Sequence, residues 1–210
     1  DALGCLRAAT DMGCDAFLMA GSQSEYGAVD GPITEESPCH PLIEYARGKL
    51  EVCRQAAELA PQLGIRYLHA RIFSVYGRGD HPWALVPTCV RTLEAGETMK
   101  LSPCGQMWNF QAAAEAAAVL ASLGTGAAES GIYNVASADT RPLRDFVEEI
   151  HRACDGKGRL AFGAYEPTEK PVSLEPDISK ITAAIGPWPA IPFQIGVERL
   201  VEEYRRTGEL

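Results

Sequence analysis

The sequence has no apolar run of the roughly 18 to 20 residues that a membrane-spanning helix needs. Its first ten residues also lack a basic region followed by an apolar stretch, so neither a transmembrane helix nor a signal peptide is expected. Glycine and proline, with 20 and 14 residues, follow no period, which excludes collagen-like and low-complexity chains. Because 46% of the 210 residues are hydrophobic, the sequence instead predicts an ordinary soluble domain with a substantial core.

Basic side chains are in the minority and form no cluster. The sequence has 19 of them against 28 acidic ones, which gives a net charge of −9. Such a surface would repel a polyanion, so no nucleic-acid partner is expected. Small anionic substrates stay possible, because one or two well-placed arginines are enough to bind them.

The seven cysteines include neither a Cys-x-x-Cys pair nor a Cys/His cluster at the spacing of metal ligands. The four histidines (His40, His69, His81 and His151) are separated and share no obvious partner, which favours surface or packing roles. No metal site is therefore expected. Scattered, reduced thiols indicate a cytoplasmic protein.

Short apolar runs alternate with amphipathic segments along the chain. Strands are predicted at 15–20, 65–73 and 131–136, and helices at 2–13, 42–60, 83–95, 109–123, 142–154 and about 193–206. The second helix should stop at Pro61 and Gly64. Strands and helices in series predict an α/β fold with a parallel sheet covered by helices.

A tyrosine and a lysine stand four positions apart in the predicted helix 42–60, as Tyr45-Ala-Arg-Gly-Lys49. This spacing places both side chains on one face of the helix, within reach of a common ligand. A lysine ammonium near a phenol favours the phenolate, which would let Tyr45 exchange a proton near neutral pH. Taken alone, the pattern also fits an ordinary surface pair.

A polar loop, Gly21-Ser-Gln-Ser-Glu-Tyr-Gly27, directly follows the first predicted strand. Open α/β sheets bind ligands at the carboxyl ends of their parallel strands. The hydroxyl of Ser22 is therefore a candidate to hydrogen-bond a substrate oxygen, although a serine here also fits a simple turn.

These signals follow one another in the order Ser22, Tyr45-x-x-x-Lys49, Ala70-Arg-Ile-Phe-Ser-Val-Tyr-Gly77, Gly131-Ile-Tyr-Asn-Val-Ala-Ser137 and Pro176-Asp-Ile-Ser-Lys180. The ordered set resembles the extended short-chain dehydrogenase/reductase family, which contains nucleotide-sugar epimerases, dehydratases and 4-keto reductases. The resemblance covers the chain from about residue 3 to 205. It implies a partial Rossmann-like doubly wound parallel sheet with a smaller carboxyl-terminal substrate-binding region.

The resemblance also implies roles for individual residues. Tyr45 would be the acid/base that moves the proton of a sugar hydroxyl or ketone, and Lys49 would assist it and hydrogen-bond the nicotinamide ribose. Ser22 would hold the same sugar oxygen while a hydride passes between the sugar carbon and NAD or NADP. The cofactor-binding residues would be Tyr45, Lys49 and Phe73, and the substrate-binding residues Ser22, Gln23, Ser74 (usually Asn in the family), Arg78 and Trp108.

The main departure from the family is the missing Gly-x-x-Gly-x-x-Gly loop, whose backbone amides approach the cofactor pyrophosphate. The family places that loop before the point where this chain, which has no initiator Met, begins. We therefore expect the carboxyl-terminal two-thirds of a longer enzyme that has roughly ninety further residues. Residues 1–82 and about 106–136 would form an incomplete Rossmann domain, and about 83–105 and 137–210 the substrate-binding region.

Two further departures bear on the reaction. Dehydratases of the family carry Asp-Glu after the Ser/Thr, but Gln23 and Ser24 cannot act as general acid or base, so dehydration is not expected. Trp108 replaces an arginine that pairs with a diphosphate in sugar epimerases, which would leave phosphate binding to Arg78 or Lys100. The motifs are most similar to those of 4-keto-sugar reductases and epimerases.

Two functions from different classes stay open. The first is an NAD(P)-dependent epimerase or 4-keto-sugar reductase that acts on a nucleotide-linked sugar. The second is a truncated, non-catalytic relative that serves as a binding or scaffold module. Family members often dimerise through the helix with Tyr-x-x-x-Lys, so helices 42–60 and 83–95 are the predicted contact of a homodimer. No membrane partner is expected.

Overall fold

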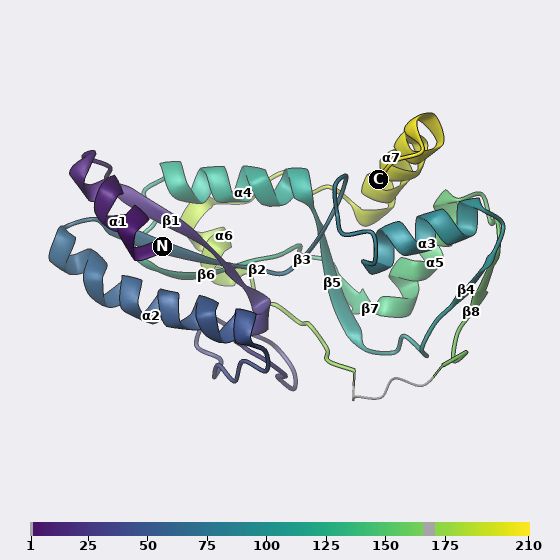
Figure 1. The fold of residues 1–210 in the computed structure, drawn as a ribbon, viewed down its shortest axis with the longest axis horizontal. Coiled ribbons are helices and arrows are strands. Elements are labelled where there is room, and N and C mark those ends of the chain that lie inside the picture. Colours follow the sequence, from purple (N-terminus) through teal and green to yellow (C-terminus); the bar gives the residue numbers. More distant parts are fainter. Residues whose placement is uncertain (1, 166–170) are drawn as a thin grey trace. The chain divides into compact units, whose positions relative to one another are not determined.

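The computed structural model describes residues 2–165 and 171–210, and the chain divides into two compact units (Figure 1). The first unit comprises Asp1–Ser74, Ala116–Ala136 and Pro176–Pro189. The second comprises Val75–Glu115, Ser137–Glu175 and Ala190–Leu210. The predicted α/β class is confirmed, with a Rossmann-like parallel sheet in the first unit.

The sheet of the first unit contains β1 (Ala16–Ser22), β2 (Arg66–Ile72) and β6 (Gly131–Val135), in the order β1-β2-β6. Both pairings are parallel, and Ser22, Ile72 and Val135 are in register. The three strands therefore end at the same edge of the sheet. Loops that carry chemistry gather at such an edge in open α/β folds.

Helices cover both faces of this sheet (Figure 1). On one face, α1 (Ala2–Asp11) and α2 (Glu44–Leu63) bury Leu6 and Ala56 against Tyr67 of β2. On the other face, α4 (Ala113–Thr125) brings Gly124 against Leu18 of β1. The helix α6 (Ser179–Ile185) contacts β6. Each large apolar side chain buried in this way contributes about 1.5–3 kcal/mol.

The helix α2 continues past the predicted stop at Pro61 and ends at Gly64, whose φ of 69° is the left-handed conformation that favours glycine. Pro61 lies in the last turn, where it removes one backbone hydrogen bond close to the helix end. The buried face of α2 comprises Ala46, Leu50, Cys53, Ala56 and Ala60. Their spacing of three and four residues is that of one helix face.

The described part of the second unit contains two small sheets and three helices. The sheets are β3 (Ser74–Tyr76), β5 (Met107–Ala112) and β7 (Thr140–Pro142), and β4 (Thr98–Lys100) with β8 (Arg159–Ala161). The helices are α3 (Leu85–Glu94), α5 (Leu143–Ala153) and α7 (Phe193–Thr207). Phe146 lies edge-on to Phe110 and Phe193, with ring centroids 5.2 and 4.8 Å away. Such pairs stabilise a core beyond the area they bury.

One predicted helix, 109–123, is wrong at its start, because residues 107–112 form the strand β5. The strand pairs antiparallel with β7. Asn109 fixes it further, since its side-chain amide donates to the Ser137 carbonyl at 2.8 Å and to the Thr140 hydroxyl at 2.9 Å. These contacts within the unit outweigh the helix propensity of the alanine run that follows.

The division into units differs from the predicted domains in three segments. Residues 75–82 and 106–115 belong to the second unit, and 176–189 to the first. The latter segment joins the first unit because the Asp177 carbonyl accepts from the Asn134 side chain of β6 at 3.2 Å. The cofactor and substrate roles predicted for the two parts stay predictions. None of the described helices is long and apolar enough to cross a membrane, and all seven cysteines are unpaired thiols.

Candidate active site

Ser22 lies at the carboxyl end of β1 and caps the short 3₁₀ helix η1 (Gln23–Glu25). Its hydroxyl accepts from the Ser24 backbone N–H at 3.2 Å and lies 2.8 Å from the Ser24 hydroxyl. Either hydroxyl can be the donor of the second bond. Where Ser24 donates, the proton of Ser22 is free to be donated to a ligand oxygen.

Tyr45 and Lys49 lie in the first turns of α2, on the same side of the helix. The Lys49 ammonium donates to the Ala20 carbonyl at 2.7 Å, which ties this part of α2 to β1 two residues before Ser22. The same ammonium is 5.7 Å from the centroid of the Tyr45 ring. Tyr45 is 57% exposed, so its phenol does not point into the core.

Gln23, the first residue of η1, is half-buried. Its side-chain oxygen is buried and has no hydrogen-bond partner within the described part of the chain. An unsatisfied buried acceptor costs about 1–3 kcal/mol. This oxygen is therefore available to a ligand that brings a hydroxyl or an amide N–H.

The other predicted site residues lie on other elements of the chain. Phe73 follows β2 and is 4% exposed, with its ring packed on Tyr26 at 6.3 Å between centroids. Ser74 is half-buried at the start of β3. In the second unit, Arg78 is exposed and pairs with Glu203 at 3.0 Å, and Trp108 packs on the ring of Phe110 at 6.1 Å.

Glu25 is a residue of the site that the sequence did not reveal. It is completely buried at the end of η1, and its carboxylate accepts from three donors: the Ser22 backbone N–H at 2.8 Å, the His69 Nε2 at 3.0 Å and the Arg71 Nε at 2.9 Å. Burial alone would raise the pKa of Glu25. The bonds to His69, Ser22 and Arg71 outweigh it and lower the pKa of Glu25 below its usual 4.5.

His69 has a partner that the sequence did not indicate. Its ring is buried, with Nε2 on the Glu25 carboxylate and Nδ1 2.8 Å from the Tyr67 hydroxyl. A carboxylate can only accept, so Nε2 carries a proton and donates to Glu25. Burial raises the pKa of Tyr67, so its hydroxyl stays protonated beside Nδ1. The sequence did contain a signal for this group: Tyr67, His69 and Arg71 alternate along β2 and therefore lie on one face of the strand.

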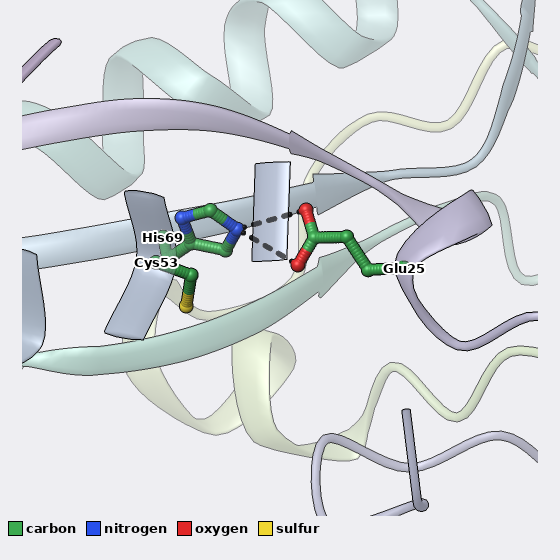
Figure 2. A group of neighbouring side chains, drawn as sticks. All are labelled: Glu25, Cys53 and His69. Atoms are coloured by element: carbon green, nitrogen blue, oxygen red, sulfur yellow. Dashed lines mark hydrogen bonds and ion pairs between the residues drawn. The ribbon is translucent and has the colours of Figure 1, made fainter. Parts of the chain in front are cut away.

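Glu25, Cys53 and His69 bring three potential metal-ligand atoms within 4.8 Å of one another (Figure 2). The dashed lines of Figure 2 join only Glu25 and His69, and the Cys53 thiol lies beside them. The Arg71 guanidinium already neutralises the carboxylate, and burial raises the pKa of the Cys53 thiol to about 11. A dication would have to displace or oppose that guanidinium, so we do not assign a metal site here.

Acid is expected to weaken the protein through Glu25. Because the folded-state pKa of Glu25 is lowered from 4.5, its carboxylate stabilises the fold above that pH, and the contribution is lost as the pH falls through the lowered pKa. At neutral pH, Glu25→Gln should reduce the free energy of unfolding by about 3 kcal/mol, because it leaves Arg71 buried without its anion. Urea titrations of both proteins measure this difference.

The difference should narrow as the pH falls below 4.5 and through the lowered pKa of Glu25, since protonated Glu25 and a glutamine are both uncharged. Other carboxylates titrate alike in the two proteins and cancel. A difference that stays constant between neutral and acidic pH would show that the charge of Glu25 does not stabilise the fold.

Comparison with known proteins places the chain in a family. Residues 2–136 match the NAD dependent epimerase/dehydratase family, and the chain belongs to it. This agrees with the resemblance seen in the order of the sequence motifs. The search of curated proteins found no match to this chain.

Solved structures with the same fold include three described here. RMD from Pseudomonas aeruginosa, in complex with NADPH, has 19% identity and a TM-score of 0.85, and the match covers 98% of this chain and 72% of the RMD chain. MoeE5 with UDP-glucuronic acid and NAD has 21% identity and a TM-score of 0.82, over 96% and 69%. A UDP-N-acetylglucosamine 4-epimerase from Methanobrevibacter ruminantium M1 has 19% identity and a TM-score of 0.86, over 98% and 67%.

Proposed function

We propose that this protein is an NAD(P)-dependent reductase or epimerase of a nucleotide-linked sugar, with Tyr45 as its acid/base. The observation that supports it most is the bond from the Lys49 ammonium to the Ala20 carbonyl. This bond holds the Tyr45–Lys49 face of α2 at the end of β1 that carries Ser22, while the phenol stays exposed. A hydroxyl, a phenol and an ammonium at the carboxyl end of a parallel strand can together transfer one proton to or from a substrate oxygen.

The site fits the nicotinamide end of a dinucleotide. Lys49 and Tyr45 would bind the ribose, and the chain has no Gly-x-x-Gly-x-x-Gly loop to which pyrophosphate contacts can be assigned. Bound NAD(P) would supply the chemistry of hydride transfer to or from a sugar carbon. NAD and NADPH are the cofactors in the solved structures of MoeE5 and RMD.

The chain's own residues would handle the proton. Tyr45 would take the proton of a sugar hydroxyl, or give one to a ketone, while Ser22 hydrogen-bonds the same oxygen, so that little charge builds up there. Lys49, as an ammonium, favours the phenolate form of its neighbour. The unpartnered side-chain oxygen of Gln23 would accept from a further hydroxyl or amide of the substrate.

The geometry of η1 disfavours dehydration. Loss of water from a sugar needs an acid to protonate the leaving hydroxyl and a base to remove a proton. Glu25 is the only carboxylate of η1, and it is buried on His69 and Arg71. Gln23 and Ser24 cannot supply it, so a reductase or an epimerase fits better.

The test is an assay of the protein, at its natural length, with nicotinamide cofactor and a panel of nucleotide sugars. UDP-glucose, UDP-glucuronic acid, UDP-N-acetylglucosamine and dTDP-glucose represent the substrates or ligands named for its structural neighbours. A net change in nicotinamide absorbance indicates a reductase, and a new sugar product without such a change indicates an epimerase. Binding of a nucleotide sugar without turnover would instead support the non-catalytic binding module.

A further inference from the structure

We infer that Glu25 is a positioning residue that fixes Ser22 in the orientation needed to hold the substrate oxygen, with His69 and Arg71 bracing it from β2. This inference rests on the proposed function of Ser22. None of the three side chains reaches solvent, so they act through Ser22 rather than on a ligand.

Glu25 and Ser22 hold each other in a reciprocal capping arrangement. The Ser22 hydroxyl caps the backbone of η1, and the Glu25 carboxylate returns to accept the Ser22 backbone N–H at 2.8 Å. The carboxylate holds the Ser22 backbone and so sets the Cα–Cβ direction, while the bond from the Ser24 backbone N–H holds the Ser22 hydroxyl. A capping box alone would hold only the turn that contains it. Here the glutamate of the box is also bonded to buried side chains of β2.

The anchor is the pair of β2 side chains on the opposite side of the carboxylate. His69 Nε2 contacts both carboxylate oxygens, at 3.0 and 3.1 Å, and Arg71 Nε contacts one of them at 2.9 Å. The guanidinium also lies over the ring of Tyr26, 4.3 Å from its centroid, and the Tyr26 hydroxyl donates to Asn134 of β6 at 2.6 Å. Bonds to charged groups in a dry interior are strong. Glu25 is thus tied to two strands.

The backbone of β1 leaves room for this arrangement. A Cβ atom on Gly21 would lie 2.3 Å from His69 Nε2 and 2.7 Å from a carboxylate oxygen of Glu25. The imidazole and the carboxylate therefore occupy the space that a side chain at position 21 would need. This close approach, directly before Ser22, places the side chains of Glu25 and His69 against the backbone that leads into Ser22.

Precise placement of a substrate-positioning group has a large kinetic effect, since a misplacement of about 1 Å can cost on the order of a hundredfold in rate. Shortening the carboxylate in Glu25→Asp keeps the charge for Arg71 but withdraws the acceptor from the Ser22 N–H. We expect kcat to fall about tenfold or more, with KM for the nucleotide sugar within about threefold. Glu58→Asp, on the exposed side of α2, is the matched control and should leave both unchanged.

A double-mutant cycle with Ser22→Ala separates positioning from general stability. If Glu25 acts through Ser22, Glu25→Asp should lower kcat in the natural protein and have almost no further effect in the Ser22→Ala background. An equal loss of kcat in both backgrounds, or no loss in either, would overturn the inference. If Ser22→Ala itself leaves turnover unchanged, the proposed role of Ser22 fails, and hydrogen exchange then decides the inference.

Hydrogen exchange of the Ser22 amide gives a readout that needs no activity. Its protection should drop by about tenfold or more in Glu25→Asp, while amides in the middle of β2 keep theirs. Unchanged protection at Ser22 would contradict the inference. Should Glu25→Asp fail to fold, His69→Leu and His69→Gln replace it, since glutamine keeps a donor near the position of Nε2. Only His69→Leu should lose protection of the Ser22 amide. Equal losses of protection in His69→Leu and His69→Gln would contradict the inference.

Discussion

Replacing Tyr45 with phenylalanine is expected to reduce turnover by about a hundredfold or more, because the change removes the hydroxyl that we propose exchanges a proton with the substrate oxygen. The ring stays in place, so binding of the nucleotide sugar and of the cofactor should change little. Tyr45 is 57% exposed, and its loss of one hydroxyl should leave the melting temperature unaltered. Single-turnover measurements of hydride transfer, with saturating ligands, isolate the chemical step.

Tyr165 offers the matched control, because it is a second exposed tyrosine, 54% accessible, to which no role in the reaction is assigned. Tyr165→Phe should turn over at the natural rate. Natural rates in Tyr45→Phe would end the assignment of the acid/base. Weak binding with normal chemistry would make Tyr45 a binding residue only.

The second large effect is expected from Gly21→Ala. The added methyl group would overlap His69 Nε2 and the Glu25 carboxylate, at 2.3 and 2.7 Å from its carbon, so the buried ion network must open. Overpacking and a disturbed buried pair together should cost about 3 kcal/mol. For a chain of this size the melting temperature should fall by about 10 °C, as calorimetry would measure.

Gly48→Ala is the control for the glycine change. Gly48 lies in α2, is exposed, and a Cβ there would meet no atom within 4 Å. Alanine is the better helix former, so this variant should gain about 0.5–1 kcal/mol. Stability of Gly21→Ala equal to that of the natural protein would show that His69 and Glu25 can move aside at little cost.

The long elements of the fold could be predicted from the sequence because their periodicity is visible over several turns or alternations. The strands β1, β2 and β6 are apolar runs next to glycine or a polar loop, and α5 has Leu143, Phe146, Val147 and Ile150 on one face. The short strands β3, β4, β7 and β8 have three residues each and show no period. They form because partners distant in sequence lie beside them.

The site divides in a similar way. Ser22, Tyr45 and Lys49 stand in a motif with fixed spacing, so they could be proposed before any coordinates. Glu25 and His69 are 44 positions apart, and only the register of β1 on β2, which sets Gly21 opposite Arg71, brings them together. Without knowledge of that register, the sequence shows only an isolated histidine and an acidic residue in a turn.

The bond between the Lys49 ammonium and the Ala20 carbonyl has an evolutionary consequence. A lysine that fastens a helix to a strand is under selection for the fold as well as for chemistry. A related protein that had lost catalytic activity would still need the lysine for its fold, whereas the exposed tyrosine could be substituted without loss of stability. The presence of the tyrosine therefore distinguishes active from inactive relatives better than the presence of the lysine does.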